Sequence, residues 1–196
     1  MSHETPRIGS AEINKVIREH LSPALREQGF QKVNTRHNWK FNEHNIWVID
    51  VTAVGSYFSD VTGWPSMSVF VECGIYYPFL NTGDFDVKIG KKGESLPRVH
   101  HCYLRLSLDS TLDQSAYTQT LKNQAERSRK DLWWIEPDGS NVDDVVMNIR
   151  DVVLNQAIPW FEKYVDWSLV MEQFKNNHSP SFFQELKGKI DHYRHT

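Results

Sequence analysis

Residues 67–76 read MSVFVECGIY, and this stretch decides the fold. Apolar side chains fall on every second residue from Met67 to Ile75, with Ser68 and Glu72 among the residues between them. Successive side chains of a β-strand point to opposite faces of the sheet, so this alternation predicts a strand with one apolar and one polar face. A sheet that is covered on one side only is typical of antiparallel pairing.

The segments on either side of this stretch show the same period of two. We predict strands over residues 36–41 and 46–53, joined by a turn at 42–45, and a fourth strand over residues 100–108. Their apolar side chains are predicted to share one face, which also carries both cysteines. These side chains are Trp47, Ile49, Val51, Ala53, Cys73, Cys102, Leu104, Leu106 and Leu108.

Helices are predicted at both ends of the chain. Apolar residues at steps of three and four predict a helix over residues 10–28, and Gly29 can adopt the left-handed conformation that ends it. A second amphipathic helix is predicted over residues 141–157, with Pro159 breaking or restarting it. Three further segments are predicted: a polar, weakly amphipathic helix over 113–130, a short edge strand over 133–135 and a last amphipathic helix over 179–193.

Length and composition fit one globular unit. The chain has 196 residues, of which 39% are hydrophobic, and a net charge of -3 that gives no general attraction to nucleic acid or anionic membranes. We expect a single α+β domain over residues 1–167 and a helical extension over 168–196. No signal-peptide pattern opens the chain, and no run approaches the roughly 18 apolar residues of a membrane span. We therefore predict a cytoplasmic location and no membrane partner.

Four short pieces resemble a known family: Gly29-Phe30-Gln31-Lys32, Tyr103-Leu104-Arg105-Leu106, Trp133-Trp134 and Ile158-Pro159-Trp160-Phe161. They lie between residues 10 and 165, and on them the chain resembles a mainly bacterial family of domains of unknown function, DUF4304. The resemblance implies the same α+β fold and brings no established activity. Residues 56–65, residues 78–98 and the tail beyond residue 167 look additional to it.

Reactive and metal-binding signatures are absent from the sequence. Adjacent His100 and His101 would point to opposite faces of a strand, so they cannot easily share a metal ion. Residues 89–93, IGKKG, lack the spacing of a phosphate-binding loop. Cys73 and Cys102 are expected to be buried thiols, and a nucleophilic cysteine needs a lowered pKa and exposure. We expect no metal site and no cofactor.

A locally basic segment contains Lys88, Lys91, Lys92, Arg98 and Arg105. Such a segment beside aromatic residues could suit single-stranded nucleic acid. The nearby acidic residues and the negative net charge make nucleic acid the less favoured partner.

Asp50, Glu72 and Arg105 are expected to project together from the polar face of the sheet. Two carboxylates and an arginine could bind a polar ligand or share a proton. The alternative is a network of ion pairs on a solvated face, which is common and adds little stability. With His101 and Tyr103 they form the set of candidate ligand-binding residues, and no catalytic residue is assigned.

The sequence thus predicts an α+β fold: a four- to five-stranded antiparallel sheet with helices on one face. Two classes of function stay open. A non-catalytic binding module, for instance an immunity-like or regulatory protein that covers a partner protein, is favoured because no reactive constellation is found. A small enzyme or ligand-binding protein that uses the polar face is the alternative, and the fold cannot choose between them.

Overall fold

The computed structural model describes residues 8–81 and 86–195. The strands are β1 (Lys32–Asn34), β2 (His37–Phe41), β3 (Ile46–Ala53), β4 (Val69–Tyr76), β5 (Lys88–Ile89), β6 (Ser95–Leu96) and β7 (Leu104–Ser107). Five of them form one antiparallel sheet in the order β1-β2-β3-β4-β7, whereas β5 and β6 form a separate hairpin. The α+β prediction is confirmed.

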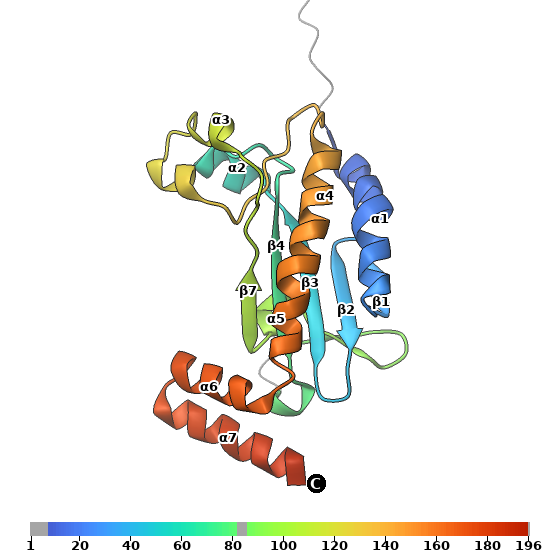
Figure 1. Ribbon diagram of the computed structural model, residues 1–196, viewed down its shortest axis with the longest axis vertical. Coiled ribbons are helices and arrows are strands. Elements are labelled where there is room, and N and C mark those ends of the chain that lie inside the picture. The colour runs from blue at the N-terminus through green and yellow to red at the C-terminus, as the bar shows by residue number, and fades with distance from the viewer. Residues whose placement is uncertain (1–7, 82–85, 196) are drawn as a thin grey trace, which may run out of the picture.

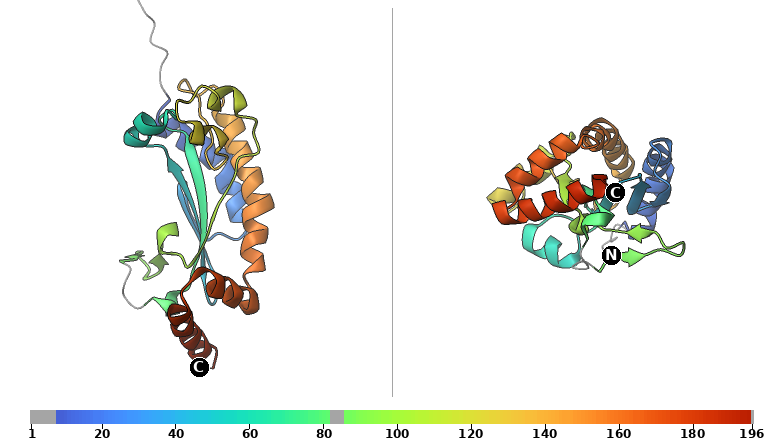
Figure 2. Two further views of the ribbon diagram at one scale, coloured as in Figure 1. Left: turned by 90° about the vertical axis from the view of Figure 1, so that its left-hand side faces the viewer. Right: turned by 90° about the horizontal axis from the view of Figure 1, so that it is seen from below.

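The α-helices are α1 (Ser10–Glu27), α2 (Ser56–Thr62), α3 (Ser115–Thr118), α4 (Val142–Val152), α5 (Ile158–Lys163), α6 (Trp167–Asn177) and α7 (Pro180–His195). Short 3-10 turns are η1 (Pro78–Leu80), η2 (Val99–His101) and η3 (Gln124–Ser128), and η4 (Val153–Ala157) is a π-helical turn. Helices α1 and α4 lie side by side on one face of the sheet, and the β5-β6 hairpin lies on the other (Figures 1 and 2).

The main core lies between the sheet and the long helices. Trp47, Ile49 and Val51 on β3 share a buried cluster with α1 and α4, as the alternation predicts. The Trp47 ring stacks on Phe161 of α5 at 4.8 Å between centroids. Part of the aromatic run after Pro159 is therefore core. Residues of α6 and α7, among them Phe174, join the same cluster, and the predicted division at residue 167 stays a prediction.

The first helix ends as its sequence indicates. Gly29 has a φ of +82°, which a glycine adopts without the cost a side chain would bring. The Phe30 amide donates to the Leu25 carbonyl at 3.0 Å, and the Phe30 side chain is buried. This closure, in which the chain folds back onto the last turn, carries the backbone into β1.

The opposite face of the sheet, which we call the outer face, is less open than predicted. At one end the hairpin covers an apolar cluster of Trp39, Ile46, Val48, Tyr76, Leu96, Val99 and Cys102. At the other end, a second cluster contains Val54, Trp64, Leu121 and Leu132. The strip between these two clusters carries the polar side chains of His37, Asp50, Glu72 and Ser107.

The predicted strand over residues 100–108 is wrong in its first half. Residues 99–101 form the turn η2, and β7 begins only at Leu104. Arg105 donates from Nε to the Cys102 carbonyl at 3.0 Å and from Nη2 to the His100 carbonyl at 2.6 Å, which holds the turn in place. Cys102 consequently joins the outer cluster and not the face of Leu104. Both cysteines are buried and form no disulfide.

Three predictions in the second half of the chain also need correction. The helix expected over residues 113–130 is replaced by α3 and η3, because this segment is too polar to bury a helical face. The helix expected over 141–157 does not stop at Pro159, since α4 continues through η4 into α5. Pro159 lies in the first turn of α5, where a missing N–H is tolerated. Trp133 forms a single β-bridge with Val69, not an edge strand.

Candidate functional site

A row of polar residues crosses four strands on the outer face. His37 on β2 is directly opposite Asp50 on β3, Asp50 is opposite Glu72 on β4, and Glu72 is opposite Ser107 on β7. Directly opposite residues in antiparallel strands have side chains close enough to interact. The row thus brings together Asp50 and Glu72, two of the predicted site residues.

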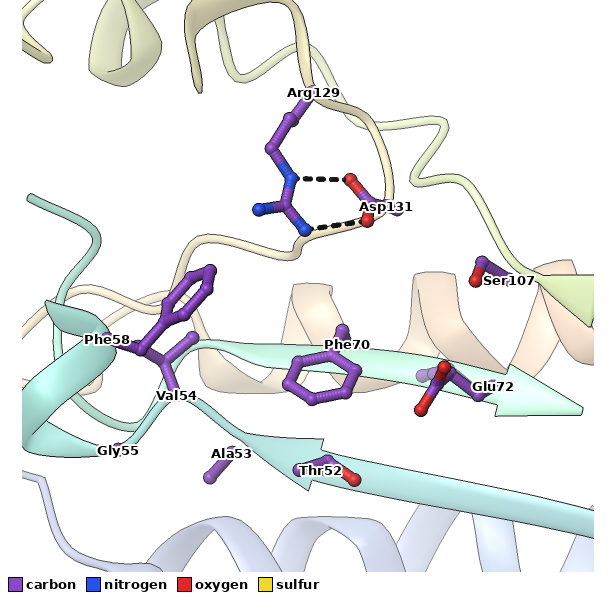
Figure 3. A pocket seen from close by; sticks show the side chains of 11 residues that line it. Thr52, Ala53, Val54, Gly55, Phe58, Phe70, Glu72, Ser107, Arg129 and Asp131 are labelled. Carbon is purple, nitrogen blue, oxygen red and sulfur yellow. Dashed lines mark hydrogen bonds and ion pairs between the residues drawn. The ribbon is translucent and has the colours of Figure 1, made fainter. Parts of the chain in front are cut away.

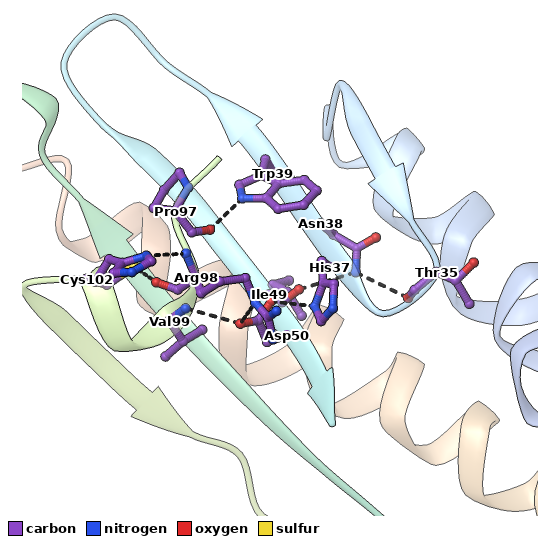
Figure 4. A network of polar contacts seen from close by, with 11 residues as sticks. Thr35, His37, Asn38, Trp39, Ile49, Asp50, Pro97, Arg98, Val99 and Cys102 are labelled. Atoms are coloured by element: carbon purple, nitrogen blue, oxygen red, sulfur yellow. Dashed lines mark hydrogen bonds and ion pairs between the residues drawn. The ribbon is translucent and has the colours of Figure 1, made fainter. Parts of the chain in front are cut away.

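Asp50 is the most buried member of this row, with a side chain only 4% exposed. Its Oδ1 lies 3.0 Å from Nδ1 of His37, and its Oδ2 accepts hydrogen bonds from Nε of Arg98 at 2.8 Å and from the Val99 amide at 3.1 Å (Figure 4). Burial acts to raise the pKa of Asp50, but the hydrogen bonds from His37, Arg98 and Val99 outweigh it and lower the pKa. Asp50 is therefore an ionised carboxylate whose oxygens are already occupied.

The same contacts orient His37 and Arg98. An ionised carboxylate only accepts hydrogen bonds, so Nδ1 of His37 carries the proton and Nε2 is left for another partner. The Arg98 side chain is 38% exposed, and its two Nη atoms form no hydrogen bond with any described residue. Asp50 thus holds a guanidinium whose outer edge is available to a carboxylate or a phosphate.

Both side chains line a cavity of about 560 Å³ between β1, β2 and the hairpin, which we call the basic pocket. Trp39 and Leu96, both buried, contribute to its lining. The Trp39 indole nitrogen donates to the Pro97 carbonyl at 2.6 Å, which fixes the start of η2 over β2. The ionisable residues of the lining are Lys32, His37, Lys88, Lys91, Lys92, Glu94 and Arg98.

Glu94 is the one carboxylate among these lining residues, and it is paired. Its Oε1 lies 2.7 Å from Nζ of Lys32, and its Oε2 accepts the Lys92 amide at 2.9 Å. The hydrogen bond from Lys32, followed by the backbone amides, lowers the pKa of Glu94 to about 2. Arg98 is balanced by Asp50, which lies behind the lining, and Lys32 is balanced by Glu94. Lys88, Lys91 and Lys92 have no balancing carboxylate among the described lining residues, so the pocket has a positive potential.

The family model described as Domain of unknown function (DUF4304) matches residues 21–163. The chain belongs to the DUF4304 family. The resemblance based on the four short motifs is thus confirmed, and every residue of the basic pocket lies inside the DUF4304 match, whereas α6 and α7 follow it. No curated protein and no solved structure matches the chain.

The other three predicted site residues of this DUF4304 member lie away from the pocket. His101 accepts the Arg98 amide at its Nδ1, at 2.9 Å, and burial, followed by the charges of His100 and Arg98, lowers its pKa. Arg105 binds the carbonyls of the η2 turn. The Tyr103 ring packs among Tyr76, Tyr77 and Phe174. The five residues do not line one common pocket.

The sequence pattern missed His37, Trp39 and Lys32 as site residues. His37 and Trp39 alternate along β2 on the outer face, and this alternation was a usable signal for a shared site. The segment that completes the site could not be found in this way, because Arg98 is 48 residues from Asp50 in the sequence.

Within residues 8–81 and 86–195, no three His, Cys, Asp or Glu side chains could together hold a metal ion. Among the described helices, none has the length and apolar composition needed to cross a bilayer.

Proposed function

We propose that this protein is a non-catalytic binding module whose basic pocket receives the carboxylates of an acidic segment on a partner protein. The observation that carries the proposal is the buried Asp50, which orients His37 and Arg98 toward a cavity that is rich in lysine. Arginine held in this way offers two parallel donors to a carboxylate, and the lysines add long-range attraction. A regulatory or immunity-like protein could cover a partner's acidic surface in this manner.

Single-stranded nucleic acid is the less suitable anion. Nonspecific binding of a strand uses aromatic rings on which bases stack along a charged groove. The aromatic residues of the basic pocket are limited to Trp39 and the ring of His37 among the described lining residues, and Trp39 is 4% exposed. A discrete pocket with one buried indole fits a side-chain carboxylate better than a run of bases.

The binding experiment uses a hexaglutamate peptide and isothermal titration calorimetry. In the variant Lys88→Gln/Lys91→Gln/Lys92→Gln, we expect the affinity to fall at least about tenfold, because three exposed cations of the pocket are removed. Raising NaCl from about 50 to about 200 mM should also weaken wild-type binding. A hexathymidylate strand should bind more weakly than the peptide.

The matched control is Lys122→Gln/Lys175→Gln/Lys187→Gln, which changes the net charge equally at exposed lysines outside the pocket. Its affinity for the peptide should stay within about twofold of wild type. Equal losses in the two triple variants would show a general charge effect and contradict the proposal. Tighter binding of the strand than of the peptide would favour nucleic acid.

An enzyme that uses the outer face has one specific observation in its favour. Asp50 and His37 form a carboxylate–imidazole pair, an arrangement that orients a general base. The described lining residues include no Ser, Thr or Cys that His37 could activate, so water would have to be the nucleophile. Turnover of bis(4-nitrophenyl) phosphate that disappears in His37→Gln would support the enzyme; we expect no turnover in the wild-type protein.

A further inference from the structure

A second cavity, of about 360 Å³, lies on the outer face and includes Glu72 and Ser107 of the polar row, and we call it the Glu72 pocket. The strands β3 and β4 form its floor, and the loop that carries Arg129 and Asp131 lies over it (Figure 3). Its side-chain lining includes Thr52, Phe58, Phe70, Glu72, Ser107, Arg129 and Asp131. A cavity of this size matches small ligands or a single long side chain.

The positive charge of this pocket is fully engaged. Arg129 donates from Nε and Nη2 to the two oxygens of Asp131, at 2.9 and 2.7 Å, and from Nη1 to Glu126 at 3.3 Å. Its guanidinium also lies over the ring of Phe58, at 5.5 Å from the centroid. Arg129 is thus held by two carboxylates and is not directed to Glu72.

Glu72, in contrast, forms no ion pair or hydrogen bond with any residue in the described part of the chain. Its side chain is half-buried and lies in the pocket beside the Phe70 ring (Figure 3). Arg98 and His37 bind Asp50, the residue opposite Glu72 on β3, and neither pairs with Glu72. A half-buried carboxylate without a partner favours a cation at that place.

The surrounding groups specify the chemistry of that cation. Phe70 presents an aromatic wall, which attracts a positively charged group over its face, and Phe58, whose ring already carries Arg129, adds apolar surface. Thr52 and Ser107 add hydroxyl groups that can accept hydrogen bonds from an ammonium. We propose that the Glu72 pocket binds an alkylammonium group, with the ammonium on Glu72 and the alkyl stem against Phe70 and Phe58. The group can belong to a lysine side chain of a partner or to a free amine.

The test measures binding of n-butylammonium by the amide shifts of Thr52, Phe70 and Ser107 in nuclear magnetic resonance spectra. We expect saturable shifts that weaken at least tenfold in Glu72→Gln, which keeps the side-chain shape and removes the charge. The matched control Glu162→Gln removes an exposed carboxylate on α5, and it should bind as the wild type does. Neutral 1-pentanol should bind at least tenfold more weakly than n-butylammonium.

A second variant separates the aromatic contribution from folding. Phe70→Leu keeps apolar bulk and should weaken n-butylammonium binding a few-fold. The midpoint of thermal unfolding of this variant is measured alongside to check that the protein is folded. The peptide acetyl-Ala-Lys-Ala-amide distinguishes a partner's lysine from a free amine. If the peptide binds as tightly as n-butylammonium, the ligand is a partner's lysine. If n-butylammonium binds and the peptide does not, the ligand is a small amine. Unchanged binding in Glu72→Gln, or equal binding of 1-pentanol, would overturn the proposal whatever the hexaglutamate experiment gives.

Discussion

At the scale of single residues, Asp50 links the sheet to the segment that covers it. Its buried carboxylate contacts one residue on β2 and two on the segment that enters η2. Removing one partner of a buried charged group leaves the others unsatisfied, which costs more than the interaction itself contributes. Asp50 is therefore expected to act on binding through the positions of His37 and Arg98, without touching the ligand.

Asp50→Asn tests this role through stability and pH. We expect the free energy of unfolding at pH 7 to fall by about 2–3 kcal/mol, measured by urea denaturation. The pKa of Asp50 is lowered in the folded protein, so its contribution is present above the ordinary carboxyl pKa and is lost as the pH falls through the lowered value. The difference between wild type and Asp50→Asn should thus shrink below about pH 4. A stability difference between wild type and Asp50→Asn that stays constant below about pH 4 would contradict this account.

At the scale of elements, residues 97–102 form a strap across the outer face. Pro97 accepts the Trp39 indole hydrogen bond, Arg98 and Val99 bind Asp50, and Cys102 lies against β4 at Gly74. A Cβ atom on Gly74 would lie 2.6 Å from both Cβ and Sγ of Cys102, closer than such atoms approach in proteins. The absence of a side chain at residue 74 is what allows the strap to lie this close to the sheet.

Gly74→Ala should push the strap away from β4. Overpacking of this kind costs about 1–3 kcal/mol, so we expect a loss of that size in the free energy of unfolding together with weaker hexaglutamate binding. Gly188 on α7 has open space where a Cβ would be added. Gly188→Ala should therefore stabilise the protein by about 0.5–1 kcal/mol, because alanine favours a helix interior. A Gly74→Ala protein as stable as Gly188→Ala would show that the strap can move without cost.

At the scale of the whole molecule, the features that depend on local periodicity could be predicted. Two signals act over only a few residues: the alternation in β3 and β4, and the glycine after α1. They were enough to predict the sheet, its covered face and the pairing of Asp50 with Glu72. The segment over residues 99–102 could not be predicted, since its conformation depends on Asp50 and on hydrogen bonds from Arg105. The basic pocket escaped prediction for the same reason: its two oriented donors come from β2 and from the strap.

The account depends most on where an acidic segment binds, and one measurement locates it directly. In ¹⁵N-labelled wild-type protein titrated with hexaglutamate, we expect saturable shifts of the Trp39 indole, of Arg98 Nε and of the amides of β5 and β6. Such a map would place the peptide in the basic pocket, between β2 and the hairpin. Saturable shifts confined to α6 and α7, or no saturable shift at all, would contradict the proposed binding site.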